Sequence, residues 1–414
     1  MPLLSFARAE KCNTLHCGAA FSCFDMRITF ISPTVNMGGG TRVVVIYAQQ
    51  LMCLGHSVRI ISPPPRVTPF AQKVRSWLKG TGGSDNASPE SYLNRSGVDH
   101  LVLDRWRPVV NDDVPDADVV IATWWETAEW VSALGPSKGA KVYFIQHHEI
   151  FPYLPVARCH ATYRLPFHKI VVAQWLREIM KAQYADDVVD VVPNSVDRNQ
   201  FFASVRGKQS VPTVGFLYST AHFKGLDVSL AALQSVREHI PNLRMICFGA
   251  ELPRPDLPLP EGATFFFSPP QNELRNIYSC CDVWLTASRS EGFNLPALEA
   301  MACRTPVVAT RAGWPEEAVK SGVNGVLINV DDRTGLVQGL QWVLSRSDQD
   351  WRRLSSNAHA TASSGSWEAS AKMFEKALEH ACCRSERGEI AGKSACPFRS
   401  SAPGVGPIQV LRWH

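Results

Sequence analysis

Short, almost wholly apolar runs alternate along most of the chain with longer segments in which apolar residues recur every three or four positions. Runs of the first kind are typical of strands buried on both faces of a parallel sheet, and segments of the second kind are typical of the helices that cover it. Two successive series of this alternation predict two doubly wound α/β domains. The predicted strands lie near 27–32, 58–62, 118–123, 140–146, 168–173 and 188–192 in the first series, and near 213–217, 244–248, 264–267, 283–287, 307–310 and 326–328 in the second.

A polar stretch at 198–212, which ends in Pro212, separates the two series and is the predicted linker. Met26 directly precedes the first predicted strand, and we interpret it as the true start. Five segments follow from this pattern. They are an irregular N-terminal extension at 1–25, a first Rossmann-like domain at 26–200, a second at 201–365, a closing helix at 366–383 and a loosely ordered tail at 384–414.

The segment 290–303 sets two glutamates, Glu291 and Glu299, across a glycine turn and the start of a helix that Pro296 suits. Backbone N–H groups at such a start are an anion site, and glycine leaves room for a phosphate to approach. Carboxylates only accept hydrogen bonds, so the pair suits the hydroxyls of a ribose and a sugar. An isolated glutamate pair is more often a solvated loop and helix surface. We assign the diphosphate contact to the N–H groups of Gly292, Phe293, Asn294 and Leu295.

Two further places carry candidate ligand contacts. Gly38 and Gly39 lie in a glycine run between the first strand and a predicted amphipathic helix at 43–54, where backbone can approach a ligand. Lys224, in the run Phe223-Lys224-Gly225-Leu226-Asp227, follows the first strand of the second series and opens a helix. Its ammonium would be aimed at the cleft as a point charge for phosphate.

Residues 278–328 resemble the family 4 glycosyltransferases of the GT-B fold. The resemblance rests on Tyr278 to Cys303, on the run 305–310, and on Gly313, Glu317, Gly322, Asn324 and Gly325. It implies a nucleotide-sugar site in the cleft between the two domains, with the acceptor on the first domain and the donor on the second. By this resemblance Glu291 contacts the donor sugar, Glu299 binds the donor ribose, Lys224 and the glycine loop at Gly38 and Gly39 face the phosphates, and the helix at 367–380 crosses back onto the first domain.

The sequence departs from that family at two points. Arg304 stands where the family usually has glycine, and the stretch 215–218 lacks the arginine that the family commonly pairs with the lysine. We expect backbone N–H groups near Ser219 and Thr220 to supply the missing contact. At the end of a predicted strand, His147, His148 and Glu149 lie where ligands bind in open α/β sheets. We assign His148 a catalytic contact with the donor sugar, and His147 and Glu149 a contact with acceptor or sugar.

The resemblance also implies transfer with retention and no cofactor beyond the nucleotide-sugar donor. We expect no metal, because Lys224 and the helix start can stabilise the departing phosphate. The pattern Asp116-Ala117-Asp118 could suit a metal but leads into an apolar run and is interpreted as a strand entry. The run 193–197 resembles the family's segment before the linker and is predicted to shape the cleft wall.

Charge and composition limit which partners and which location the protein can have. The net charge is +4, of which +3 lies in 384–414, so the folded body is nearly neutral and gives no nucleic-acid signal. The 12 cysteines are scattered without a framework spacing, and no run of apolar residues is long enough to span a membrane. The sequence therefore predicts a cytoplasmic protein. The segment 66–80 combines apolar positions at helical spacing with basic residues, so peripheral contact with a membrane is one interpretation and an ordinary surface helix the other.

The predicted function is transfer of a sugar from a nucleoside-diphosphate sugar to an acceptor hydroxyl, on a sugar or a lipid-linked glycan, in polysaccharide or glycoconjugate synthesis of the cell envelope. Residues 123–127 and 143–149 bear a weak resemblance to bacterial rhamnosyltransferases. Two alternatives stay open: a nucleotide-sugar epimerase or hydrolase of the same fold, and a non-catalytic nucleotide-sugar-binding protein, which the missing arginine and Arg304 would permit.

Overall fold

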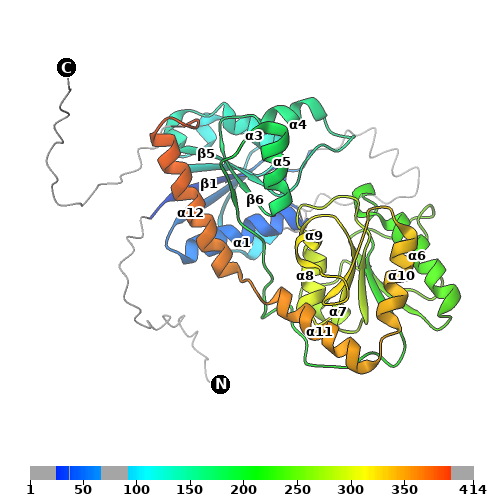
Figure 1. The fold of residues 1–414 in the computed structure, drawn as a ribbon. Coiled ribbons are helices and arrows are strands. Elements are labelled where there is room, and N and C mark those ends of the chain that lie inside the picture. Colours follow the sequence, from blue (N-terminus) through cyan, green and yellow to red (C-terminus); the bar gives the residue numbers. More distant parts are fainter. Residues whose placement is uncertain (1–24, 37, 67–91, 393–414) are drawn as a thin grey trace, which may run out of the picture.

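The computed structural model describes residues 25–36, 38–66 and 92–392. Two α/β domains, each built on its own parallel sheet, lie side by side and are joined by the chain near residue 200 and again by a long helix near the end (Figure 1). Most of the extension predicted at 1–25 and most of the basic helix predicted at 66–80 lie outside the described residues. No helix within the described ranges is long and apolar enough to cross a membrane.

The first sheet has seven parallel strands in the order β3-β2-β1-β4-β5-β6-β7. Its inner strands are buried along nearly their whole length, as apolar runs in a doubly wound sheet must be. The edge strand β3 was not predicted, because all four of its residues are exposed or half-buried and the first two are polar, so they form no apolar run. The strands are β1 (Arg27–Ile31), β2 (Ser57–Ser62), β3 (Asp99–Val102), β4 (Val119–Ala122), β5 (Ala140–Ile145), β6 (His168–Val171) and β7 (Val189–Val191).

Within the described residues, four helices lie along the chain between the strands of this sheet, together with short 3-10 turns. Helix α1 begins within the glycine run, at Gly39 rather than at 43, so Gly39 and Gly40 belong to its first turn. Because β1 ends and α1 begins at the same edge of the sheet, this turn faces the second domain (Figure 1). The helices are α1 (Gly39–Cys53), α3 (Trp125–Ser132), α4 (Val156–Thr162) and α5 (Gln174–Tyr184).

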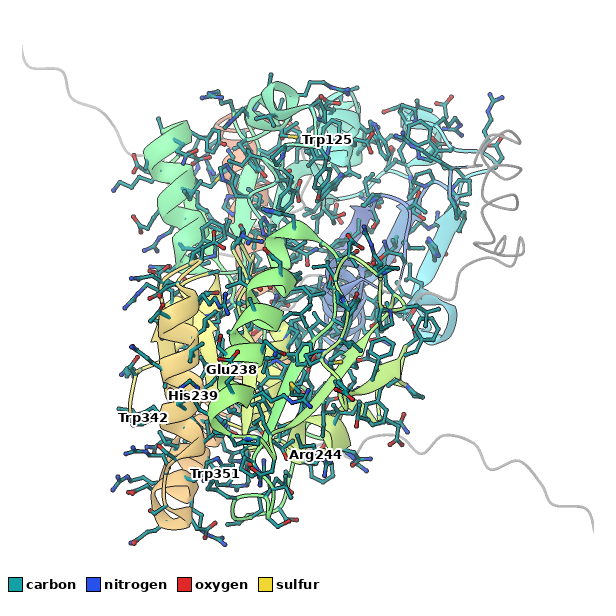
Figure 2. The ribbon with its side chains drawn as sticks, turned by 90° about the vertical axis from the view of Figure 1, so that its right-hand side faces the viewer. Trp125, Glu238, His239, Arg244, Trp342 and Trp351 are labelled. Carbon is teal, nitrogen blue, oxygen red and sulfur yellow. The ribbon has the colours of Figure 1, made fainter. Side chains whose placement is uncertain are left out.

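The second sheet has six parallel strands in the order β10-β9-β8-β11-β12-β13, and all of them were predicted to within a residue or two. Trp351 ties α11 to this sheet, since it is fully buried and its Nε1–H donates to the carbonyl of Asp282 over 2.8 Å (Figure 2). The strands are β8 (Thr213–Leu217), β9 (Arg244–Gly249), β10 (Thr264–Phe267), β11 (Val283–Thr286), β12 (Val307–Thr310) and β13 (Gly325–Ile328). The helices are α6 (Leu226–His239), α7 (Leu274–Ser279), α8 (Leu295–Ala302), α9 (Trp314–Ala318), α10 (Arg333–Leu344) and α11 (Asp348–Ala362).

Helix α12 (Trp367–Glu386) leaves the second domain and packs beside α1 on the first sheet (Figure 1). Phe374 stacks on Tyr47 of α1 with ring centroids 4.6 Å apart, and both rings are fully buried. The expectation of a loosely ordered tail from 384 is wrong for its first part. The helix continues to Glu386, and Ser385 and Ile390 are both buried although residues 384–386 are polar. Local contacts hold this part, since Ser385 Oγ donates to the carbonyl of Gly392 and Arg384 pairs with Glu389. Residues 393–414 lie outside the described residues.

Candidate active site

Lys224 and Glu291, the predicted phosphate and sugar contacts, form a close ion pair. Lys224 ends the 3-10 turn η4 (His222–Lys224), and its Nζ donates to both carboxylate oxygens of Glu291 over 2.8 and 2.9 Å. Ser288 Oγ donates to the same carboxylate over 2.7 Å. The Glu291 side chain is 7% exposed and that of Lys224 is 22% exposed, so the lysine is the member of the pair that a ligand in the cleft can contact.

The turn that carries Lys224 depends on Gly225. This residue has φ 61°, and a Cβ there would lie 2.0 Å from the carbonyl oxygen of Ala287. Only glycine combines the left-handed backbone with such a close approach. Gly225 therefore lets the start of α6 press against the end of β11, which brings Lys224 to Glu291.

The N-terminus of α8 presents free backbone donors beside this pair. Asn294 adopts φ 81° and caps the helix, since its side-chain oxygen accepts from Ala297 N and its amide donates to Thr286 Oγ1. Throughout the described part of the chain, nothing accepts a hydrogen bond from the N–H groups of Gly292, Phe293, Asn294 or Leu295. These four N–H groups lie at the positive end of a helix, as the anion-site prediction requires.

Glu299 lies on α8 and is 4% exposed. Two side chains hold its carboxylate: Arg42 Nη1 donates to Oε1 over 2.6 Å, and Tyr278 Oη donates to Oε2 over 2.8 Å. Burial and the neighbouring carboxylate raise the pKa of Tyr278 well above its usual value, so the phenol stays a donor. Sequence reasoning missed both partners. Arg42 could have been noticed because it follows the glycine run by two residues, in the first turn of α1. Tyr278 could have been noticed because it is the first residue of the segment that resembles the family.

Gly292 brings the two domains into contact rather than leaving room for a phosphate. A Cβ on it would lie 1.6 Å from the carbonyl oxygen of Gln146, at the end of β5. Trp175 of α5 donates its Nε1–H to the carbonyl of Gly292 over 2.9 Å, and its backbone N–H donates to Glu317 over 3.1 Å. The expected role of Gly292 as open space is therefore corrected, since that face is occupied by the first domain. Its N–H remains free.

Of the three polar residues after β5, the structure brings His147 to the site. His147 Nε2 lies 3.3 Å from Ser290 Oγ, and the ring also contacts Phe223 and Trp175. Burial lowers the pKa of His147, which favours a neutral ring. His147 is therefore the histidine that the structure places beside Glu291.

The structure does not bring His148 or Glu149 to that pair. His148 Nε2 lies 2.7 Å from Tyr184 Oη inside the first domain, and burial lowers its pKa to about 4. Glu149 is 1% exposed and accepts from Trp125 N over 2.8 Å, and burial raises its pKa well above the usual value. The chain bends at Gln146 and His147 after β5, and of the three candidates His147 is left half-buried at the domain border while His148 and Glu149 are buried in the first domain. The expected sugar and acceptor contacts of His148 and Glu149 are corrected accordingly.

The glycine loop lies at the border between the domains. Gly38 donates its N–H to Asn36 Oδ1 over 2.7 Å, and Gly40 accepts at its carbonyl from Gln146 over 3.2 Å. A Cβ on Gly39 would meet nothing within 4 Å. Gly38 and Gly39 are exposed, so the loop has room for a ligand.

The two departures from the family pattern have local explanations. Arg304 has φ 61°, a conformation that glycine adopts without strain, and its Nε donates to the carbonyl of Ala203 over 3.0 Å. It therefore points toward the linker and not toward Glu291. After β8, the N–H groups of Ser219 and Thr220 have no acceptor within the described ranges, as the expected substitute for the missing arginine requires.

The acidic groups first considered for a metal are already matched by cations. Asp118 accepts from the guanidinium of Arg27 at 3.0 Å, and Asp116 accepts from Lys138 at 3.0 Å.

A second group, His168, Asp190 and His380, gathers where β6, β7 and α12 meet. Arg384 donates to His168 Nδ1, so the ring carries its proton on Nε2 and donates it to Asp190, which leaves no lone pair on Nε2 for a metal.

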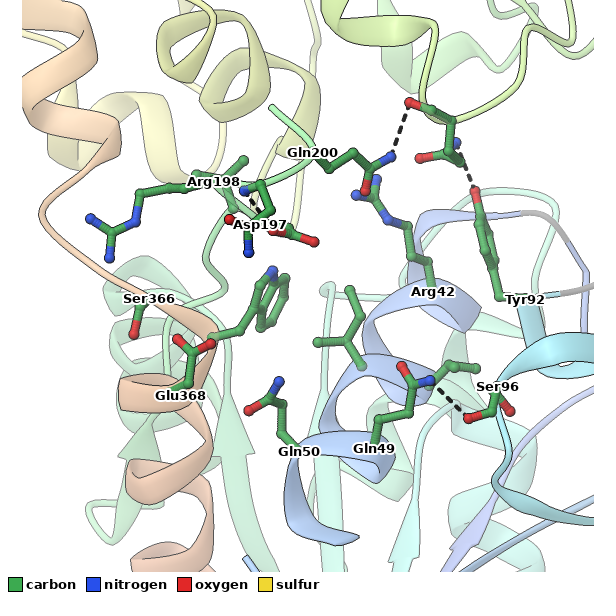
Figure 3. A pocket seen from close by; sticks show the side chains of 16 residues that line it. Arg42, Gln49, Gln50, Tyr92, Ser96, Asp197, Arg198, Gln200, Ser366 and Glu368 are labelled. Carbon is green, nitrogen blue, oxygen red and sulfur yellow. Dashed lines mark hydrogen bonds between the residues drawn. The ribbon is translucent and has the colours of Figure 1, made fainter. Parts of the chain in front are cut away.

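A polar cavity of about 740 Å³ lies on the linker side of the cleft, between α1, the linker and α12 (Figure 3). Neither Lys224 nor Glu291 lines it, and it adjoins the charged site through Arg42. Gln200 donates to the carbonyl of Gln271, whose side chain in turn donates to Tyr92 across the domain border. We place the nucleotide-sugar donor at the ion pair of Lys224 and Glu291 and not in this cavity, because the free N–H groups of the α8 N-terminus lie beside that ion pair.

Residues 197–361 match the family described as glycosyl transferases group 1. The second domain is similar to group 1 glycosyl transferases. The chain is 34% identical over 181 residues to a D-inositol 3-phosphate glycosyltransferase of Corynebacterium urealyticum, which covers 40% of this chain and 42% of that protein. A protein of the same name from Corynebacterium jeikeium is 30% identical over 227 residues, 49% of this chain and 54% of its own. The chain thus spans about half the length of these relatives.

Solved structures extend the likeness to both domains. The sucrose-phosphate synthase of Thermosynechococcus elongatus aligns with a TM-score of 0.67 at 16% identity, over 86% of this chain and 98% of that one. The Anabaena protein HepE in complex with UDP-glucose aligns with a TM-score of 0.63 at 18% identity, over 86% and 99%. At such identities the likeness shows the fold, so the predicted GT-B arrangement of two Rossmann-like domains is confirmed. The weak resemblance to rhamnosyltransferases stays a prediction.

Proposed function

We propose that the chain is a retaining glycosyltransferase that moves a sugar from a nucleoside-diphosphate sugar to an acceptor hydroxyl. The observation that carries the proposal is the ion pair Lys224–Glu291 beside the four free N–H groups of the α8 N-terminus. A lysine ammonium and a helix N-terminus together favour a diphosphate. The likeness of the second domain to group 1 glycosyl transferases supports this assignment.

The donor would lie along α8. Its diphosphate would accept from Lys224 and the N–H groups of 292–295, and its ribose hydroxyls would donate to Glu299. Its sugar would then lie toward Glu291 and His147, where the first domain meets the loop. The first domain would present the acceptor, as the resemblance implies.

Retention follows from a reaction on one face of the sugar. The bond between the sugar C1 and the phosphate oxygen breaks, the acceptor oxygen bonds to C1 on the same face, and the acceptor proton passes to the departing phosphate oxygen. No side-chain nucleophile is needed. The protein stabilises the negative charge that grows on the diphosphate, through Lys224 and the helix N-terminus, and holds the reactants in place. We propose that no metal is needed, because these groups supply the positive field.

The acceptor belongs to the same proposal. Curated relatives are named for D-inositol 3-phosphate, a polyol with a phosphate, and we infer that a hydroxyl of a sugar or of a lipid-linked glycan is the acceptor here. We place the protein in polysaccharide or glycoconjugate synthesis for the cell envelope, in the cytoplasm. The segment 66–80 is either the site of a peripheral membrane contact or an ordinary surface helix. Arg66, the described residue of that segment, stacks on Trp106 and pairs with Glu126.

The test is release of nucleoside diphosphate from a panel of nucleotide sugars that includes UDP-glucose and dTDP-rhamnose. The purified protein is first screened for thermal stabilisation by each donor, since a ligand at about 100 times its Kd adds about 2.7 kcal/mol to the free energy of unfolding. The proposal is supported if nucleoside diphosphate is released in the presence of an acceptor mixture and the sugar is recovered in a glycosidic product. The linkage of that product should have the same anomeric configuration, α or β, as the donor.

The two alternatives give different results in the same assay. An epimerase or hydrolase would turn over the donor without acceptor, yielding an isomer or free sugar. A non-catalytic binding protein would be stabilised by the donor but release nothing. Glu299→Gln serves as the matched variant, because it keeps the shape of the side chain and removes the charge that the ribose hydroxyls would meet.

A further inference from the structure

Arg42 reaches from the first domain into the donor site of the second. It lies on α1, and its Nη1 donates to Glu299 Oε1 over 2.6 Å. The side chains are only 13% and 5% exposed. The guanidinium also lies 5.3 Å from the ring of Phe201 in the linker. This contact is therefore built from three segments that are far apart in the sequence.

The charges of the second domain leave Glu299 without a cation of its own. Lys224 is matched by Glu291 through both carboxylate oxygens. Arg289, the arginine next in sequence to that loop, turns to Asp227 and Asp331. Within the described ranges, Arg42 is the basic side chain paired with Glu299.

Burial opposes the charge on Arg42, but the attraction of Glu299 more than offsets it, so the pKa of Arg42 is raised. Without Arg42, the buried Glu299 carboxylate would keep the hydrogen bond from Tyr278 but lose its cation, and a buried carboxylate without a cation carries a desolvation cost. Each carboxylate oxygen can accept two hydrogen bonds. Arg42 uses one site on Oε1 and Tyr278 one site on Oε2, which leaves one acceptor site on each oxygen for a pair of hydroxyls.

We propose that Arg42 is a donor-positioning residue, which holds the Glu299 carboxylate oriented for the ribose hydroxyls of the nucleotide. The inference rests on the proposed function, because it takes Glu299 as the ribose contact. Since Arg42 belongs to the first domain, recognition of the ribose then depends on the two domains being in contact. Arg42 also brings a positive charge to a cleft in which the segment after β8 has no arginine.

The test compares a ribonucleoside diphosphate with its 2′-deoxy form. Titration calorimetry on the full chain measures the Kd of whichever of UDP, GDP, ADP or CDP binds most tightly, and of its 2′-deoxy counterpart. A hydrogen bond to a charged group is worth about tenfold in affinity or more, so wild type should prefer the ribose form by about tenfold. Arg42→Met should lose about tenfold for the ribose form and little for the deoxy form, so that the preference shrinks.

Three variants accompany this measurement. Arg42→Lys keeps a charge and should restore part of the preference. Glu299→Gln should also lose the preference, and adding Arg42→Met to it should cost little more, because both act through the same carboxylate. Arg59→Met removes an exposed arginine of the first domain that pairs with Asp99 and should leave both affinities unchanged.

Two results would overturn the inference. Arg42→Met could keep the full preference for the ribose form, or it could bind both nucleotides more tightly, in which case Arg42 merely blocks Glu299 in the empty site. Either result leaves the proposed function standing. Failure of wild type to bind any nucleoside diphosphate would instead contradict the proposed function, and this inference with it.

Discussion

Replacing Lys224 by methionine separates the stability of the site from its chemistry. The variant keeps the length of the side chain but removes the ammonium that donates to both oxygens of Glu291. The Glu291 side chain is 7% exposed, and among the described residues it would keep the hydroxyl of Ser288 as its remaining donor. The variant therefore leaves a buried carboxylate without its cation, and removes a positive charge from the place where the phosphate is proposed to leave.

The two consequences have different sizes. Breaking a fully buried ion pair costs about 3–5 kcal/mol, and we expect about 2 kcal/mol here, because the Lys224 side chain is 22% exposed. Loss of one preorganised donor to a developing charge costs about 10²–10³ in rate. The double variant Lys224→Met with Glu291→Gln removes both charges, so its free energy of unfolding should return to within about 1 kcal/mol of wild type while turnover stays low.

Chemical denaturation measures the free energy of unfolding, and nucleoside-diphosphate release measures turnover. Lys372→Met, which removes an exposed lysine from α12, is the matched control and should change neither. Turnover of Lys224→Met within about threefold of wild type would refute the role given to the lysine. A double variant as unstable as the single one would refute the charge argument for Glu291.

Three further changes test other parts of the structure. Gly292→Ala would place a Cβ 1.6 Å from the carbonyl oxygen of Gln146, so it should separate the domains locally and lower both the Tm and turnover, and an unchanged Tm would contradict that contact. Arg304→Gly removes the strain of a left-handed backbone but also removes the hydrogen bond to the carbonyl of Ala203. The two effects oppose each other, so the free energy of unfolding should change by less than about 1 kcal/mol, and turnover should stay the same. Burial lowers the pKa of His148 to about 4, so the folded state disfavours a proton that the unfolded chain binds below about 6.5. Stability should therefore fall as the pH falls from about 6.5 to about 4, and His148→Gln should make denaturation midpoints less dependent on pH over that window.

The sequence predicted the strands well because most of them are buried on both faces. A run such as Val307 to Thr310 has no polar position to blur its bounds, and it was located to the residue. The edge strand Asp99–Val102 was missed for the opposite reason, since it is mostly exposed and its composition resembles a loop. Helix α12 was predicted too short, because the sequence beyond Cys383 is polar although Ser385 and Ile390 are buried against the first domain.

The candidate site was predicted where its parts are near in sequence. Glu291, the N–H groups after it and Glu299 lie within one strand-turn-helix unit, so local pattern placed them together. The contacts between domains could not be predicted in that way. Arg42 meets Glu299 across 257 residues, and which of His147 and His148 points to the cleft depends on the local direction of the chain after β5. The carbonyl of Gln146 against Gly292 is likewise fixed only by the packing of the two domains.

Binding of a nucleoside diphosphate along α8 can be seen in a crystal structure of the protein with bound UDP or ADP. We expect diphosphate oxygens within hydrogen-bonding distance of Lys224 Nζ and of the N–H groups of residues 292–295, and a ribose whose hydroxyls donate to Glu299. A nucleotide bound instead in the linker-side cavity, near Arg198 and Glu368 and with the α8 N-terminus empty, would contradict it.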